Sequence, residues 1–349
     1  MTEIAWVFGT RPELVKIAPV VRALKARNVA QRLIATGQHK DLLDPSLLAE
    51  LGEVESLGLA SDGSVVRFLA DARDRLRGAF DRRPAIVAVQ GDTMSAFAGA
   101  SLARSLDIPV AHVEAGVRSG NRENPWPEEM IRREIDAWAT WRYAPTMHCG
   151  KNLLREDIAE FMVCGNTSVD NLMASGVVPR REDGAVCLVT LHRRELRQRA
   201  DARELVQGAL NAMGATAAAW VWPVHPGMHE VLQGLSVPAN VTLRPPFDYR
   251  TLLDVLAGVR GVLTDSGGLV EEAATLGVPT VILRDANDRP EACEAGIAAQ
   301  CRVDVANIGV AVEALALGRI ADRKPCAVYG DGRAGGRIAL HLAQSLQGS

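Results

Sequence analysis

Four side chains that could move protons stand where apolar stretches of the chain give way to polar residues. They are Asp92, Glu114, Glu128 and His192. A carboxylate at the end of a buried strand is costly unless it is paired, so Glu114 points to function. Asp92 could instead cap a helix, Glu128 could complement a helix dipole, and a lone histidine is often structural. As a set, they predict proton transfer to and from a bound substrate.

A second pattern is typical of phosphate binding. Residues 262–272 read Val-Leu-Thr-Asp-Ser-Gly-Gly-Leu-Val-Glu-Glu, which is the end of an apolar run, a glycine turn and the start of a helix. The first amides of such a helix carry the positive end of its dipole, and Gly267 and Gly268 have no Cβ to hold a phosphate away. Glu272, one turn further on, could hold a diol such as a ribose. The alternative is a turn that serves packing alone.

Basic side chains near the first turn of the chain are candidate phosphate contacts. Arg11 and Lys16 follow the first apolar run and could reach an anion, although a solvated surface charge is the alternative for Lys16. Arg132 could likewise lie on a solvated helix face, and His225 precedes a proline at the end of another apolar run. The first turn, Gly-Thr-Arg-Pro, is not GxGxxG, and the chain has neither a Walker lysine motif nor a nucleophile elbow.

The elements that must position these groups alternate between strand and helix. Predicted strands cover residues 4–8, 33–36, 85–89, 109–113, 142–144 and 161–164, and then 187–191, 219–224, 240–243, 261–263 and 280–283. Helical patterns lie between them, and a last one covers 337–346. This alternation predicts an α/β fold with parallel sheets and right-handed crossovers. Ligands bind such sheets at the carboxyl ends of the strands, where the polar candidates collect.

Length and composition bound the class of protein. A chain of 349 residues favours two domains, which we expect over residues 1–168 and 169–330. A net charge of -3 gives no sign of a nucleic-acid surface or a basic membrane patch. The six cysteines show neither CxxC nor zinc spacing, which favours a reducing compartment without a structural metal. No leader peptide or membrane span is indicated, so we expect a cytoplasmic protein whose partners are small molecules.

Short blocks distributed over nearly the whole chain carry a resemblance to a known family. They cover residues 8–13, 36–39, 90–93, 112–116, 125–129, 165–167, 192–195, 223–226, 264–272, 289–291 and 329–332. In their residues and order, they resemble bacterial, non-hydrolysing UDP-N-acetylglucosamine 2-epimerases. The resemblance implies the GT-B fold, in which two Rossmann-like domains with parallel sheets face each other across a cleft. It also implies that residues 331–349 form a helix crossing back to the first domain, and that the chain forms a homodimer.

The resemblance further implies a mechanism and a set of residues. A base removes the C2 proton of the sugar while UDP leaves C1, and UDP adds back to the 2-acetamidoglucal after reprotonation on the other face. Asp92, Glu114, Glu128 and His192 match positions implicated in this chemistry, with the base in each direction left open. The UDP-sugar substrate would be bound by Arg11, Lys16, Arg132, His225, Ser266, Gly267, Gly268, Glu272 and Arg289. No metal and no redox cofactor is implied.

Departures from the family pattern and alternative functions remain open. Residues 286–288 are Ala-Asn-Asp where members commonly have Thr-Thr-Glu, and Ile131 replaces an asparagine. Gln38 and His39 match a block at which some members bind a second substrate molecule as activator. The alternatives are a hydrolysing relative that releases ManNAc and UDP, an epimerase of a modified UDP-GlcNAc, a GT-B glycosyltransferase and a UDP-sugar-binding regulatory protein.

Overall fold

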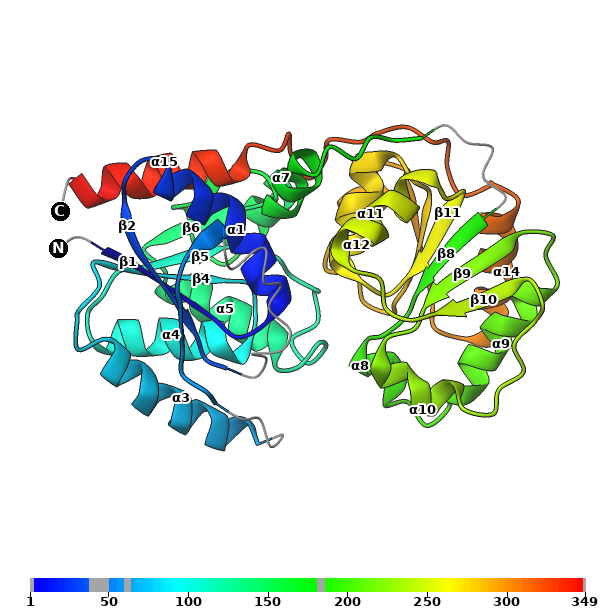
Figure 1. The fold of residues 1–349 in the computed structure, drawn as a ribbon, viewed down its shortest axis with the longest axis horizontal. Coiled ribbons are helices and arrows are strands. Elements are labelled where there is room, and N and C mark those ends of the chain that lie inside the picture. Colours follow the sequence, from blue (N-terminus) through cyan, green and yellow to red (C-terminus); the bar gives the residue numbers. More distant parts are fainter. Residues whose placement is uncertain (1–2, 38–49, 60–63, 181–185, 348–349) are drawn as a thin grey trace. The chain divides into compact units, whose positions relative to one another are not determined.

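The computed structural model describes residues 3–37, 50–59, 64–180 and 186–347. The chain divides into two compact units, each built around one sheet (Figure 1). Unit 1 comprises residues 1–171 and 330–349, and unit 2 comprises residues 172–329. In the described ranges, no helix is long and apolar enough to cross a membrane.

Unit 1 contains a parallel sheet of seven strands in the order β3-β2-β1-β4-β5-β6-β7. The strands are β1 (Glu3–Phe8), β2 (Ala30–Ala35), β3 (Val54–Ser56), β4 (Ile86–Gln90), β5 (Val110–Val113), β6 (Trp141–Ala144) and β7 (Met162–Val163). The central strands β1, β4 and β5 are buried throughout, as continuous apolar runs in a parallel sheet require. Helices therefore cover both faces of this sheet.

The helices of unit 1 form two layers. They are α1 (Arg11–Lys25), α3 (Val65–Ala79), α4 (Met94–Ser105), α5 (Glu128–Trp138), α6 (Met147–Leu154), α7 (Thr167–Ala174, which runs into unit 2) and α15 (Ala334–Gln347). The C-terminal helix α15 lies against α1, while α3, α4 and α5 pack beside one another on the other face (Figure 1). Gly335 permits the close approach of α15, because a Cβ there would lie 2.7 Å from the backbone of Pro19.

Unit 2 repeats the plan with a parallel sheet of six strands in the order β10-β9-β8-β11-β12-β13. The strands are β8 (Val186–Thr190), β9 (Ala219–Pro223), β10 (Val241–Arg244), β11 (Gly261–Thr264), β12 (Thr280–Leu283) and β13 (Ala298–Cys301). The helices are α8 (Arg194–Arg197), α9 (Ala202–Gly214), η1 (Pro226–Met228), α10 (His229–Leu232), α11 (Tyr249–Gly258), α12 (Gly267–Leu276), α13 (Glu291–Glu294) and α14 (Val305–Ala316). Helices α9 and α14 pack together on one face, and α11 and α12 on the other (Figure 1).

The two parallel sheets confirm the predicted fold class. Both are doubly wound, with the order of strands reversing beside the first strand of each unit. Two such α/β units in series, with a terminal helix that returns to the first, constitute the GT-B architecture. Open α/β sheets bind ligands at the carboxyl ends of the strands, at the point where the order of strands reverses.

Candidate active site

Ionisable side chains gather at the strand ends beside the reversal point of each sheet. In unit 1 the reversal separates β1 from β4, and in unit 2 it separates β8 from β11. Unit 1 holds the predicted residues Arg11, Lys16, Asp92, Glu114, Glu128 and Arg132, and unit 2 holds His192, His225, Ser266, Gly267, Gly268, Glu272 and Arg289. Gln38 and His39, the predicted activator contacts, lie outside the described residues.

Glu114, directly after β5, is held by two donors on one oxygen. The Lys16 ammonium and the side-chain amide of Gln90 both lie 2.5 Å from Glu114 Oε2. The Glu114 backbone is left-handed, with φ of 71°, and its amide and that of Ala115 both bond the carbonyl of Tyr143. A left-handed residue with a Cβ costs about 1–3 kcal/mol and persists only where its surroundings fix it, which is typical of functional sites. Lys16 therefore contacts a carboxylate in this structure.

Asp92 pairs with an arginine of α5. Arg132 Nη2 lies 2.5 Å from Asp92 Oδ2, and Arg132 is 4% exposed while the Asp92 side chain is 26% exposed, so a buried guanidinium holds a carboxylate that water can still reach. Glu129, which is completely buried, contacts Arg132 and accepts a bond from the backbone amide of Ser119 at 2.9 Å. Glu129 thus fastens the loop before α5. Glu128, the first residue of α5, is half-buried at the same end of the helix.

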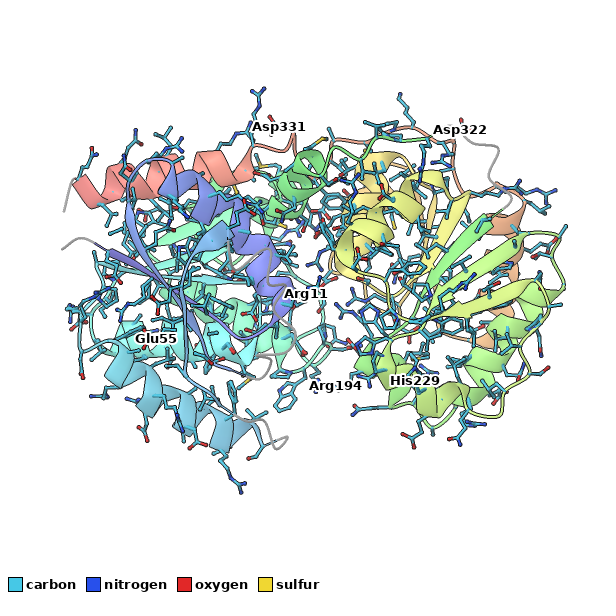
Figure 2. The ribbon with its side chains drawn as sticks, in the orientation of Figure 1. Arg11, Glu55, Arg194, His229, Asp322 and Asp331 are labelled. Carbon is cyan, nitrogen blue, oxygen red and sulfur yellow. The ribbon has the colours of Figure 1, made fainter. Side chains whose placement is uncertain are left out.

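The first turn of the chain is organised by Glu13. Its carboxylate accepts bonds from the amides of Gly9 and Thr10 and from the hydroxyls of Thr10 and Thr93. These bonds join the ends of β1 and β4. Burial raises the pKa of Glu13 to about 7, although the four donors act to lower it. Arg11, labelled in Figure 2, is the first residue of α1 and stands beside this turn.

His192 follows β8 and is anchored by Asp265. The backbone amides of His192 and Arg193 both donate to the Asp265 carboxylate, at distances of 2.9–3.1 Å, and His192 Nδ1 lies 3.5 Å from it. The His192 side chain is 37% exposed, so the ring is accessible. The ring of His225 lies 5.6 Å away between centroids. Desolvation and the positive charge of neighbours, His192 first, lower the pKa of His225.

The two glycines at the start of α12 have different surroundings. A Cβ on Gly267 would lie 2.7 Å from Nη1 of Arg289, so this glycine allows the guanidinium to pack against the helix. A Cβ on Gly268 would meet nothing within 4 Å. Ser266 is the N-cap residue, and its side chain makes no capping bond to the helix. The N-terminus of α12 therefore combines a helix dipole, a nearby cation and open space beside Gly268, which suits an anionic ligand.

Acidic side chains surround the guanidinium at this helix. Arg289 Nε lies 2.5 Å from Glu271 Oε1, and Arg289 Nη1 lies 3.0 Å from Asp288 Oδ2. Asp288 also pairs with Arg284 at 2.6 Å, so the residue that departs from the family pattern bridges two arginines. On the same helix, Glu272 accepts a bond of 2.8 Å from the hydroxyl of Tyr249.

Several residues that shape these sites were not predicted as site residues. Gln90 and Asp265 lie inside the motif blocks that carry the family resemblance, but the sequence does not show which residues they contact. Tyr249 is far in the sequence from Glu272, and no local pattern indicated the contact. Among the described residues, no cluster of histidine, cysteine and carboxylate side chains could hold a metal ion.

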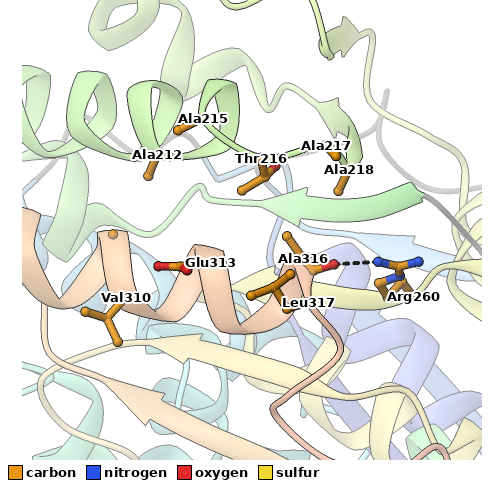
Figure 3. Close-up of a pocket in the computed structure, with 11 residues that line it drawn as sticks. Ala212, Ala215, Thr216, Ala217, Ala218, Arg260, Val310, Glu313, Ala316 and Leu317 are labelled. Carbon is orange, nitrogen blue, oxygen red and sulfur yellow. Dashed lines mark hydrogen bonds between the residues drawn. The ribbon is translucent and has the colours of Figure 1, made fainter.

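A separate pocket of about 660 Å³ lies between α9 and α14 (Figure 3). It is lined largely by alanines, with the exposed side chains of Val310 and Leu317 at its edge. Arg260 crosses one end and bonds the carbonyl of Ala316 (Figure 3). None of the predicted site residues lines this pocket, so it is not the site defined by the strand ends.

Two doubly wound units with ionisable groups at their reversal points define a ligand-binding α/β protein of the GT-B type. The family model described as UDP-N-acetylglucosamine 2-epimerase matches residues 22–343. The chain belongs to this family, as its motif blocks predicted.

Individual relatives agree over nearly the full length. A UDP-N-acetylglucosamine 2-epimerase of Bacillus subtilis is 33% identical, over 97% of this chain and 94% of the relative. The structure of S. aureus MnaA with UDP has a TM-score of 0.89 at 30% identity, and covers 99% of this chain and 97% of that one. The structure of UDP-GlcNAc 2-epimerase from Neisseria meningitidis bound to UDP-GlcNAc has a TM-score of 0.86 at 29% identity, over 98% of this chain and 100% of that one.

Proposed function

We propose that this chain catalyses the reversible conversion of UDP-GlcNAc to UDP-ManNAc by eliminating UDP and adding it back. A base takes the proton from C2, the C1–O bond breaks with its electron pair going to UDP, and a C1=C2 double bond forms. Return of a proton to the opposite face of C2 and of UDP to C1 gives the epimer. Membership of the family and the UDP-GlcNAc named for the solved relative support this substrate.

The observation that carries the proposal is the constrained placement of Glu114. A carboxylate that serves as an acid or base must be aimed at one carbon atom, and Glu114 is aimed by a strained backbone and two short bonds. Asp92, paired with Arg132, and Glu128 supply further acid–base groups in the proposal. Lys16, beside Glu114, would help to hold that carboxylate in place during the reaction.

The leaving group would be held by unit 2 in this proposal. The first amides of α12, with Ser266 and Gly268, would seat the diphosphate, and Glu272 would accept bonds from the ribose hydroxyls. Arg289 beside the helix, His192 and His225 would offset the charge that develops on UDP as the C1–O bond breaks. Arg11 would add a cation from the first turn of unit 1.

A time course with UDP-GlcNAc tests this proposal against its neighbours. Anion-exchange chromatography should show UDP-GlcNAc and UDP-ManNAc approaching a constant ratio, with free UDP remaining a minor species. Steady accumulation of UDP with free ManNAc would show the hydrolysing reaction instead. Consumption that depends on an added sugar acceptor would show a glycosyltransferase, and no consumption with tight UDP binding would show a binding protein.

A further inference from the structure

His112, on β5, lies with both ring nitrogens against acceptors. Its Nδ1 is 2.6 Å from Asp136 Oδ1, and its Nε2 is 2.9 Å from the carbonyl oxygen of Gly91. The His112 and Asp136 side chains are completely buried. A carbonyl oxygen can only accept, so Nε2 faces Gly91 as a donor.

Asp136 is anchored by two further donors besides the His112 ring. Its other oxygen accepts from the amide of Gly116 at 3.0 Å and lies 2.8 Å from the guanidinium of Arg118. Burial raises the pKa of Asp136, but His112, Arg118 and the Gly116 amide outweigh it and hold the pKa below its ordinary value. Arg142, on β6, adds a further cation facing Asp136. His112 therefore contacts a carboxyl group that is also anchored by Gly116 and Arg118.

This buried contact between His112 and Asp136 ties together the segments that carry two of the carboxylates of the proposed reaction. Through Nε2 it holds Gly91, which has φ of 69° and directly precedes Asp92. Through Asp136 it holds Gly116, which has φ of 79° and lies two residues after Glu114. Both strand ends are thus fixed to α5 by one buried contact.

Helix α5 fixes Asp92 from a second direction. Arg132, which pairs with the Asp92 side chain, stands one helical turn before Asp136. The backbone beside Asp92 and the tip of its side chain are therefore both held by residues of the same helix, four positions apart. Movement of α5 or loss of the His112–Asp136 contact would change the direction of Asp92.

We propose that the buried His112–Asp136 pair positions Asp92 and Glu114 for proton transfer, with neither residue touching the substrate. The inference rests on the proposed epimerisation for the roles of the two carboxylates. His112 and Asp136 lie behind the two reacting carboxylates, and a displacement of those carboxylates by about 1 Å can lower the rate by about 100-fold.

The first test is Asp136→Asn, compared with Asp170→Asn. Asp170 accepts bonds from the amides of Ala334 and Gly335 at the start of α15, so it is a carboxylate of the same unit that fixes a helix rather than a strand end. We expect Asp136→Asn to lower kcat by about 100-fold with KM changed by less than about threefold and with UDP affinity, measured by calorimetry, unchanged. Asp170→Asn should lower thermal stability and leave kcat unchanged.

Three results of this comparison would overturn the inference. They are wild-type kcat in folded Asp136→Asn, a change confined to KM, and an equal loss of kcat in both variants, which would reflect general destabilisation. If Asp136→Asn does not fold, the variant His112→Gln decides. It should lower kcat while UDP affinity is retained, and a wild-type kcat in the folded variant would overturn the inference. A wild-type protein without epimerase activity would reject the proposed function, whereas an active wild type with unaffected variants would reject this inference alone.

Discussion

Replacing Glu114 by glutamine should remove one charge and leave the shape of its cluster intact. Lys16 and Gln90 both donate to the same oxygen, so an amide oxygen in that place could still accept both bonds. A hydrogen bond involving a charged group contributes about 1.5–3 kcal/mol to stability and a neutral one about 0.5–1.5 kcal/mol, so we expect a loss of about 1–2 kcal/mol in the free energy of unfolding.

The expected effect of Glu114→Gln on the reaction is larger. Loss of a positioned acid or base lowers the rate by about 10²–10⁴-fold. This corresponds to about 3–5 kcal/mol on the activation barrier. Comparing the loss in the free energy of unfolding with the rise in the activation barrier separates a catalytic role from a structural one. A purely structural residue would lower the free energy of unfolding at least as much as it raises the activation barrier.

The assay for Glu114→Gln combines three measurements. Thermal unfolding reports the fold, calorimetry with UDP reports binding, and the initial rate of UDP-GlcNAc conversion reports turnover. Glu134→Gln, at an exposed position of α5, is the matched control and should behave as wild type in all three. A Glu114→Gln protein that folds, binds UDP and turns over within about fivefold of wild type would show that Glu114 is not a catalytic acid or base.

Three further predictions concern the starts of helices α12 and α1 and the side chain of His192. Gly267→Ala should lower the free energy of unfolding because its Cβ would lie 2.7 Å from Arg289, whereas Gly268→Ala should raise it by about 0.5–1 kcal/mol. Gly268→Ala should also weaken UDP binding. Thermal unfolding and calorimetry with UDP measure these effects, and equal effects of the two variants on stability would contradict the prediction. Burial raises the pKa of Glu13 to about 7, so its protonated form stabilises the native state at low pH, and that contribution is lost as the pH rises through about 7. The unfolding free energy of wild type relative to Glu13→Gln should fall between about pH 4.5 and about pH 7, and a rise over that range would contradict the prediction. His192→Ala should lose most turnover while UDP binding stays measurable, and a wild-type rate would remove the ring from the mechanism.

The fold could be predicted from sequence where strands are long apolar runs. The residues predicted for β12 are those observed, and α12 ends at Gly277, whose φ of 71° suits glycine. The edge strands β3 and β13 were missed. Each is three or four residues long and partly exposed, so neither shows the continuous apolar pattern of a central strand.

The site could be predicted only as positions along the chain. The end of each apolar run marks a strand end, so Asp92, Glu114 and His192 could be named from sequence. Their partners could not, because Lys16 lies 98 residues from Glu114, and Asp265 lies 73 from His192. The left-handed backbone of Glu114 has no sequence signal either, since glutamate normally avoids it.

In the proposed reaction, C2 of the sugar loses and regains a proton, and proton NMR after incubation with UDP-GlcNAc in D2O follows this exchange. We expect deuterium at C2 of the UDP-ManNAc formed, and of the UDP-GlcNAc recovered after equilibration, with incorporation lost in Glu114→Gln. Epimerised product with hydrogen retained at C2 would contradict it.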